Sequence, residues 1–79
     1  MIIINKQEDL IKYCTGNTIV FEKAVHIKCD IDVKCNISAW DITYFAVCDV
    51  HSNILCKSIK GRRENSKHFC LDGKITIKP

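Results

Sequence analysis

Apolar residues recur at a step of five in the middle of the chain. Ile37, Ile42 and Val47 lie five apart, and Ile54 and Ile59 resume the step after a slip of two positions. An amphipathic helix needs apolar spacings of three and four, and a single half-buried strand needs sustained alternation. A short period without Gly or Pro punctuation is typical of a β-solenoid, in which each side of a coil is a few residues long and inward residues stack. The pattern therefore predicts an all-β fold, a short right-handed parallel β-solenoid of about three coils.

The N-terminal segment shows a different pattern. Asn5 is a candidate helix N-cap, and Glu8 three residues later completes a capping box, so we expect a helix over residues 6–15. An open solenoid end exposes unpaired backbone and apolar core, and we predict that residues 1–17 form a helical cap that covers it. A helix packed on an ordinary small sheet is the alternative. The chain is then a single domain, with the solenoid in residues 18–79.

Cysteine is abundant, with six residues in a chain of 79. The chain contains no C-x-x-C pair, and in a reducing compartment buried thiols behave as small hydrophobes. Cys14, Cys35 and Cys56 are evenly spaced, since the interval from the first to the second equals that from the second to the third. We take this interval as one coil, which predicts that the three thiols stack on one interior wall.

Positive charge is concentrated near the C-terminus. The segment 57–68 contains five basic residues and one acidic residue, whereas the whole chain has a net charge of +3. Gly61 should let the chain turn, so we expect a basic loop near residues 60–68 between two returns to the core. Arg side chains bind phosphate and carboxylate groups bidentately, which makes this loop the candidate partner-binding site. Its basic residues are Lys57, Lys60, Arg62, Arg63 and Lys67.

Large aromatic residues interrupt the pattern of small residues. Trp40 and Tyr44 either fill a corner of the solenoid or stand outside it as an aromatic patch for a partner. Because both alternatives remain open, both residues are candidate partner-binding residues.

Catalytic and metal-binding patterns are weak. Cys48-x-x-His51 and His68-x-Cys70 offer isolated ligands rather than the paired motifs of a zinc site. No nucleophile elbow or phosphate-cradling Gly-rich loop accompanies any Cys or His. Asp residues before inward Ile residues, such as Asp30, are expected to be turn residues that bond to nearby backbone. We therefore expect no enzymatic activity, no metal and no cofactor.

The segment CNISAWDITYFAVCDVHSNILCKSIKGRRENSKHFCLDGKI resembles a family of short proteins of bacteriophages and other mobile elements in low-GC bacteria. Its members are built from N-I-x-A-x and D-I-x-A-x steps and often end in a segment like CKSIKGRRENSKHFCLDG. The resemblance covers roughly residues 30–77, and this chain departs from it where Tyr44 and Phe45 replace small residues. It implies a phage-borne accessory protein, and the family has no established enzymatic activity that could be transferred to this chain.

Two functions follow as expectations. In the first, the protein inhibits a host defence system by protein–protein contact, as an anti-CRISPR protein does, and its partner is a host defence protein or ribonucleoprotein complex. In the second, the basic segment from Lys57 to His68 grips nucleic acid. The initial apolar run, Ile2 to Ile4, is too short for a secretory signal or membrane span, so we expect no membrane association and a location in the bacterial cytoplasm. The small core also leads us to expect a homodimer.

Overall fold

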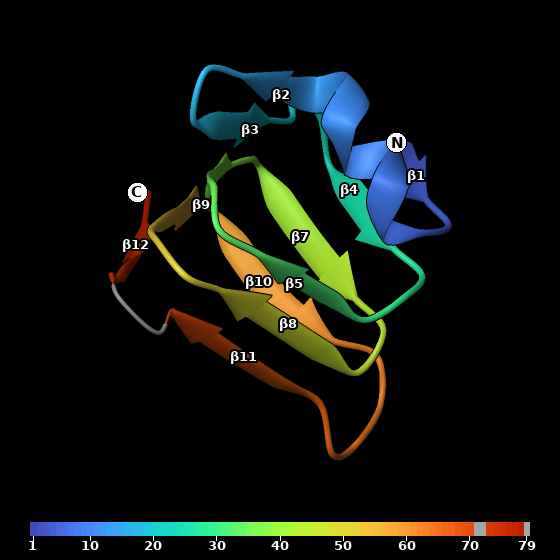
Figure 1. Cartoon of the computed structure of the whole chain (residues 1–79). Helices are drawn as coiled ribbons and strands as arrows, with labels where there is room; N and C mark the ends of the chain where they lie inside the picture. Colours follow the sequence, from blue (N-terminus) through green and yellow to red (C-terminus); the bar gives the residue numbers. More distant parts are fainter. Residues whose placement is uncertain (71–72, 79) are drawn as a thin grey trace.

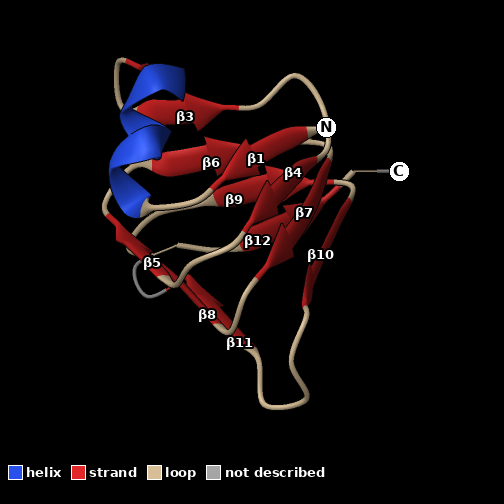
Figure 2. Ribbon diagram, turned by 90° about the vertical axis from the view of Figure 1, so that its right-hand side faces the viewer, coloured by secondary structure: helices blue, strands red, loops and turns tan. Residues whose placement is uncertain are grey.

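The computed structural model describes residues 1–70 and 73–78 and contains three sheets around one core (Figure 1). Sheet A has the strand order β1-β4-β7-β10, sheet C has the order β11-β8-β5, and sheet B has the order β12-β9-β6-β3-β2. The elements are β1 (Ile2–Ile4), the 3-10 helix η1 (Gln7–Tyr13), β2 (Cys14–Thr15), β3 (Thr18–Val20), β4 (Val25–Ile27), β5 (Ile31–Val33), β6 (Asn36–Ser38), β7 (Asp41–Tyr44), β8 (Val47–Val50), β9 (Ile54–Cys56), β10 (Ser58–Gly61), β11 (Lys67–Cys70) and β12 (Ile75–Ile77). Viewed from the side, the sheets form the walls of a triangular tube (Figure 2).

The chain visits the three sheets in the same order, A, C and B, three times over. The successive coils are β4-β5-β6, β7-β8-β9 and β10-β11-β12, and each strand pairs in parallel with its equivalent one coil later. The predicted three-coil β-solenoid with a short helix near the N-terminus is confirmed, while the right-handed sense of the coil stays a prediction.

The coil length differs from the predicted value. Ile37 pairs with Ile54 and Ile42 pairs with Ile59, so equivalent positions in the middle of the solenoid have a sequence separation of 17. The side-chain contacts of Asp30 with Val47 and of Asp41 with Ser58 have the same separation. Among the strand pairings of residues 1–70 and 73–78, a separation of 21, the interval between the cysteines, is found where β9 meets β12, as in the pairing of Ile54 with Ile75. Each step of five residues corresponds to one side of the triangle. The side that follows β8 is longer by two residues, and the three sides together make up the coil length of 17.

The predicted column of three cysteines is therefore wrong. Cys14 is exposed, Cys35 is half-buried and Cys56 is fully buried. The central coils are shorter than the interval between these cysteines. Two residues separated by that interval therefore lie at different positions around the coil and do not stack on each other. Their equal spacing does not reflect stacking.

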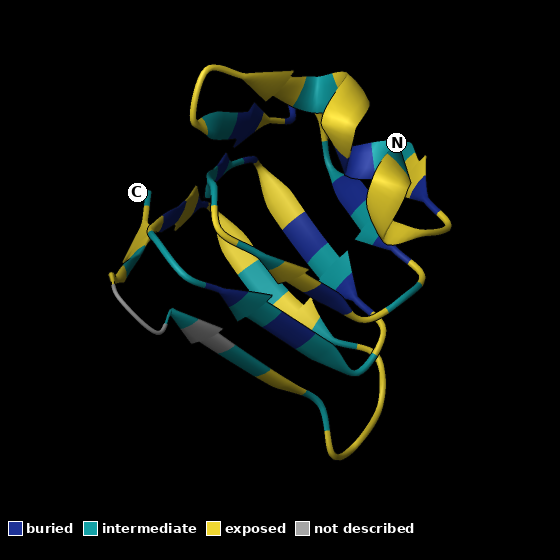
Figure 3. Ribbon diagram, in the orientation of Figure 1, coloured by how far each residue is buried: buried dark blue, intermediate teal, exposed yellow. Residues whose placement is uncertain are grey.

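The core consists of inward residues that stack from coil to coil on each wall (Figure 3). On sheet B, Ile19, Ile37 and Ile54 are stacked and are each no more than 3% exposed. Stacking of this kind pairs identical β-branched side chains across neighbouring strands, which suits the pleated surface of a sheet. Within the part of the chain whose burial is described, the other buried core residues are Ile4, Leu10, Phe21, Val25, Ile27, Ile31, Ala39, Ile42, Tyr44, Cys48, Val50 and Cys56.

The N-terminal helix takes the place of a sheet C strand in the first, incomplete coil. It runs over Gln7–Tyr13 and is shorter than predicted, because the chain continues as β2, which pairs antiparallel with β3. The capping-box prediction is wrong, since the N-cap residue is Lys6 and it makes no side-chain cap hydrogen bond. Leu10 is 2% exposed and joins the core from above.

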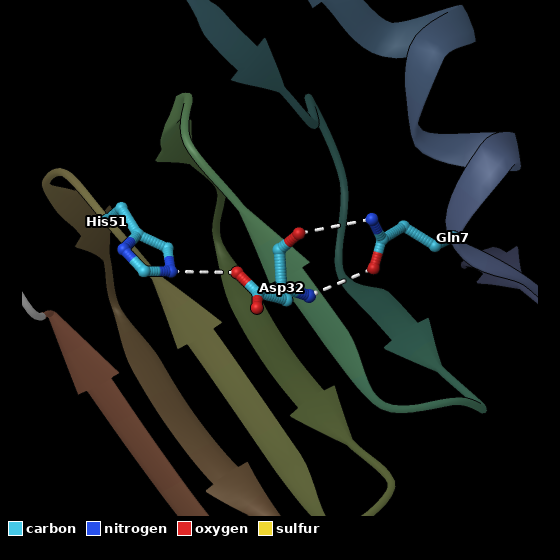
Figure 4. Close-up of polar contacts among 3 residues, drawn as sticks. All are labelled: Gln7, Asp32 and His51. Atoms are coloured by element: carbon cyan, nitrogen blue, oxygen red, sulfur yellow. Dashed lines mark hydrogen bonds and ion pairs between the residues drawn. The ribbon is translucent and has the colours of Figure 1, made fainter.

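The helix is joined to the edge of sheet C by one amide side chain (Figure 4). Gln7 Oε1 accepts a hydrogen bond of 2.9 Å from the backbone N–H of Asp32, and Gln7 Nε2 donates one of 3.1 Å to its carbonyl oxygen. The amide thus occupies the position of a neighbouring strand's peptide group, which protects an edge that could pair with another chain. On the other side, His51 Nε2 lies 2.8 Å from Asp32 Oδ1.

Asparagine supports a corner between sheets C and B. Asn36 Oδ1 accepts a hydrogen bond from the backbone N–H of Asn53 at 3.1 Å, and Asn53 Oδ1 accepts one from Lys74 at 3.0 Å. The first residue of each N-I-x step therefore bonds to the coil below. Asp30 acts similarly at the corner between sheets A and C, where its carboxylate accepts the N–H of Val47 at 2.8 Å. Asp30 thus bonds to backbone, but to that of the next coil and not to its own turn as predicted.

Candidate functional site

The predicted basic loop joins β10 to β11 and projects from one corner of the triangle (Figure 2). Its backbone is held in place: Arg62 N–H donates to the Tyr44 carbonyl at 2.9 Å, and Arg63 N–H donates to Ser66 Oγ at 2.9 Å. Ser66 Oγ also donates to the carbonyl of Phe45 at 3.2 Å. The loop is thus anchored to the coil above, which fixes where its two arginines lie.

Gly61 is needed for close packing rather than for an unusual backbone angle. Gly16 is the glycine with a positive φ, of 62°, whereas Gly61 packs beneath a ring. A Cβ atom at Gly61 would lie 3.0 Å from Tyr44 Cε2 and would overlap the side chain of Ser66. Gly61 was predicted to allow a turn, but its role is steric. The absence of a side chain lets β10 approach the core at this point.

Of the two alternatives for Tyr44, the structure supports the buried one, which removes it from the candidate partner-binding surface. It is 1% exposed, and its hydroxyl lies 2.7 Å from His68 Nδ1. Burial raises its pKa, so the phenol stays neutral and serves as a hydrogen-bonding group. The reason is positional: Tyr44 follows inward Ile42 at the alternation of a strand, and Gly61 below it leaves room for the ring.

Trp40 lies outside, at the corner that leads into sheet A. It is 47% exposed, and two ammonium groups lie over its ring. Lys57 Nζ is 4.8 Å and Lys78 Nζ 5.9 Å from the ring centroid. The predicted aromatic patch therefore exists at Trp40, and sequence analysis missed Lys78, which reaches the same ring from the last coil.

Phe45 forms a second aromatic corner at the opposite end of β7. The guanidinium carbon of Arg63 lies 5.1 Å from the centroid of its ring, which is 37% exposed. Because a strand advances about 3.3 Å per residue, Phe45 and Trp40 are separated by about 16 Å along one wall. Both ends of β7 thus present an aromatic ring covered by a cation.

The outer face of sheet A connects these corners. Its basic residues are Lys60 in β10 and His26 in β4, and Arg62 reaches across the face so that its Nη1 lies 3.0 Å from His26 Nε2. Lys28 follows β4 at the same corner as Arg62. We call this surface the basic wall, and its residues are His26, Lys28, Trp40, Phe45, Lys57, Lys60, Arg62, Arg63 and Lys78.

Lys67 is separated from the other predicted residues. It begins β11 and pairs with Val47 of β8, so it lies on sheet C rather than on the basic wall. The structure therefore brings together Lys57, Lys60, Arg62 and Arg63 with Trp40, along one sheet and its two corners.

The fold directs Cys48 and His51, a candidate ligand pair, away from each other. Cys48 is fully buried, and burial raises its pKa to about 12, which keeps the thiol protonated. His51 points outward to Asp32, away from Cys48. Among the residues that the structure describes, no three Cys, His, Asp or Glu side chains gather as a metal site requires. Within the same part of the chain, no helix has the length and apolar character needed to cross a membrane.

Comparisons with known proteins add no identification. No protein-family model matches this chain, and neither curated proteins nor solved structures give a match. The fold and the basic wall are therefore the basis of the functional proposal.

Proposed function

We propose that this protein is a small binding protein, without catalytic activity, that acts by protein–protein contact through the basic wall. The observation that carries the proposal is the pair of exposed aromatic corners, Trp40 and Phe45, each covered by a cation and joined by the outer face of one sheet. Tryptophan and arginine are enriched among the residues that dominate protein interfaces. A sheet also holds such groups more rigidly than a free loop would, which reduces the entropy lost on binding.

The roles of the potentially reactive side chains support a binding function. His68 bonds to the buried Tyr44, and His51 bonds to Asp32 at the edge of sheet C. The raised pKa of Cys48 makes its thiol a poor nucleophile. These groups have structural partners that account for their presence in the chain.

We propose further that the partner is a host defence protein of a bacterium, which the resemblance to phage-borne proteins implies, and that binding inhibits it. The protein would then act in the bacterial cytoplasm, and its self-association as a homodimer stays a prediction. A net charge of +3 is modest for a dedicated nucleic-acid-binding protein and favours a protein surface as the main contact.

Nucleic acid is the second candidate partner. The observation that favours it is the stacking of Lys57 and Arg63 on exposed rings, because single strands bind to aromatic platforms flanked by cations. Salt separates the two candidates: a contact with single-stranded nucleic acid loses affinity with a slope of about −0.7 per phosphate in log salt.

Affinity capture from a bacterial lysate tests the proposal with three forms of the protein. The wild type is compared with Arg62→Glu/Arg63→Glu, which reverses charge on the basic wall. The matched control is Lys34→Glu/Lys74→Glu, which makes the same charge change at exposed positions on the corner between sheets C and B. Recovery of one protein by the wild type and the control, but not by the wall variant, and its persistence after nuclease treatment, is the expected result. Recovery that depends on intact nucleic acid would favour the second candidate, and equal recovery by all three forms would contradict the use of this wall.

A further inference from the structure

Arg62 and His26 make an unusual contact on the basic wall. Arg62 follows β10 and His26 lies in β4, so the arginine side chain crosses the intervening β7 to bring Nη1 within 3.0 Å of His26 Nε2. An arginine side chain keeps its proton in proteins and can only donate, so His26 must accept through Nε2. The imidazole in this contact is therefore neutral, with its proton on Nδ1.

The surroundings of this contact are positively charged. Lys28 follows at the end of β4, and Lys60 lies on the same face in β10. Neighbouring strands β1 and β7 place the uncharged Ile3 and Thr43 beside His26. Burial, then the charges of Arg62 and Lys28, lower the pKa of His26 below its ordinary value.

No carboxylate forms an ion pair with this cluster within residues 1–70 and 73–78. The ion pairs of these residues join Lys6 to Glu8 and His51 to Asp32, and neither includes His26, Lys28 or Arg62. A guanidinium that bonds to a neutral imidazole rather than to an acid has donors left for an external anion.

We propose that His26, Lys28 and Arg62 form a binding site for a phosphate group on the basic wall. A phosphate between the imidazole and the guanidinium accepts charge-assisted hydrogen bonds from both, with His26 taking up one proton from solvent as the phosphate binds. Lys28 adds a third positive group at the corner. Binding should therefore strengthen as the pH falls through the pKa of the free His26.

The phosphate site makes the proposed function more specific. It rests on that function only in assuming that the basic wall is the surface that binds the partner. It names the chemical group that the wall recognises on its partner. The phosphate is either a free or terminal group, or a diester of a nucleic-acid backbone, and both sources offer the same oxygens.

Histidine ring resonances provide a direct test. The wild type is titrated with pH in sodium chloride and in sodium phosphate at equal ionic strength, and the pKa values of its three histidines are compared. In saturating phosphate the pKa of His26 should rise by about one unit, which means that the protonated form binds phosphate about tenfold more tightly than the neutral form. His51 and His68 lie on other parts of the solenoid and act as internal controls, so their titrations should not change.

Two variants and two further ligands make the test specific. Arg62→Gln should abolish the phosphate-dependent rise of the His26 pKa, whereas Lys34→Gln, a lysine on the opposite corner, should leave it intact. A single-stranded oligonucleotide without a terminal phosphate should produce the rise if the site takes a diester, and inorganic phosphate alone should produce it if the site takes a free phosphate. Equal rises in acetate and phosphate would overturn the phosphate assignment. Equal His26 pKa values in chloride, in phosphate and with the oligonucleotide, or a rise that persists in Arg62→Gln, would overturn the site.

These outcomes are independent of the capture experiment. A partner whose recovery needs Arg62 and Arg63, with no response of His26 to inorganic phosphate or to the oligonucleotide, would refute the phosphate site and leave the proposed function standing. A phosphate response of His26 without any partner captured through the basic wall would support the phosphate site and refute the proposed function.

Discussion

The buried thiol of Cys48 should make the protein lose stability in alkaline solution. Burial raises the pKa of Cys48 in the folded protein to about 12, whereas the ordinary value is 9.0. The folded state therefore holds the thiol proton more tightly than the unfolded state. A stabilising contribution of this kind is fully present below pH 9 and is lost as the pH rises from about 9 to about 12.

The size of the loss follows from these two values. At pH 10 roughly nine tenths of the unfolded thiols are ionised but only about one hundredth of the folded ones, which lowers the free energy of unfolding by about 1.4 kcal/mol relative to pH 8. Urea denaturation at the two pH values, in the presence of a reductant, measures it. With a denaturant slope of about 1–2 kcal/mol per molar, the midpoint should fall by about 1 M because of Cys48.

Substitution isolates this thiol from other groups that titrate in the same range. Cys48→Val keeps an apolar side chain of similar size in the column below Ile31, and it should reduce the alkaline loss by about 1.4 kcal/mol. Cys14→Val is the control, because the Cys14 thiol is exposed and solvent screens its interactions. An alkaline loss that is the same in Cys48→Val and the wild type would refute the reasoning.

Three further predictions test the fold. Ile37→Ala should lower the free energy of unfolding by about 2–5 kcal/mol, because it leaves a cavity in the middle of the sheet B column, whereas Leu55→Ala, 38% exposed on the outer face, should cost less than about 1 kcal/mol; chemical denaturation of both variants checks this. Gln7→Ala should cost about 1 kcal/mol and speed hydrogen exchange at the Asp32 amide, which loses its acceptor, and unchanged exchange there would argue against the helix attachment. Gly61→Ala should cost about 1–3 kcal/mol by overpacking, visible as a lower melting temperature, and a neutral effect would contradict the close approach of β10 to the core.

The period of the solenoid could be predicted from the sequence, but its coil length was misjudged. The step of five from Ile37 to Ile42 is one wall of the triangle, and the slip of two positions before Ile54 already contained the true separation between Ile37 and Ile54. The predicted coil length was instead based on the longer interval between the cysteines, and it is therefore too long for the central coils. A thiol such as Cys35 fits both a corner and a core position, so cysteine spacing cannot fix a register that branched residues determine.

The candidate site was predicted in part. Arg62 and Arg63 stood out by charge, and their place at an anchored, exposed loop agrees with that prediction. His26 and Lys28 were missed because they lie far earlier in the chain. The correct coil length would have predicted their position. Residues 28 and 62 are two central coils apart in the sequence and therefore lie at the same corner of the solenoid. The position of Tyr44 stayed open because alternation shows that a residue points inward only once the strand limits are known.

The central claim is that Arg62 and Arg63 belong to a binding surface and contribute little to stability. The measurement that tests it most directly compares thermal melting and partner binding of the wild type with those of Arg62→Glu/Arg63→Glu. Both side chains are exposed, so each substitution should change the free energy of unfolding by less than about 0.5 kcal/mol. The melting curve should therefore be almost unchanged. Binding to the captured partner should weaken at least a hundredfold, or about 2.7 kcal/mol, because repulsion replaces charge-assisted hydrogen bonds. Unchanged affinity in the double variant, with the same melting curve, would contradict the account and place the functional surface elsewhere on the solenoid.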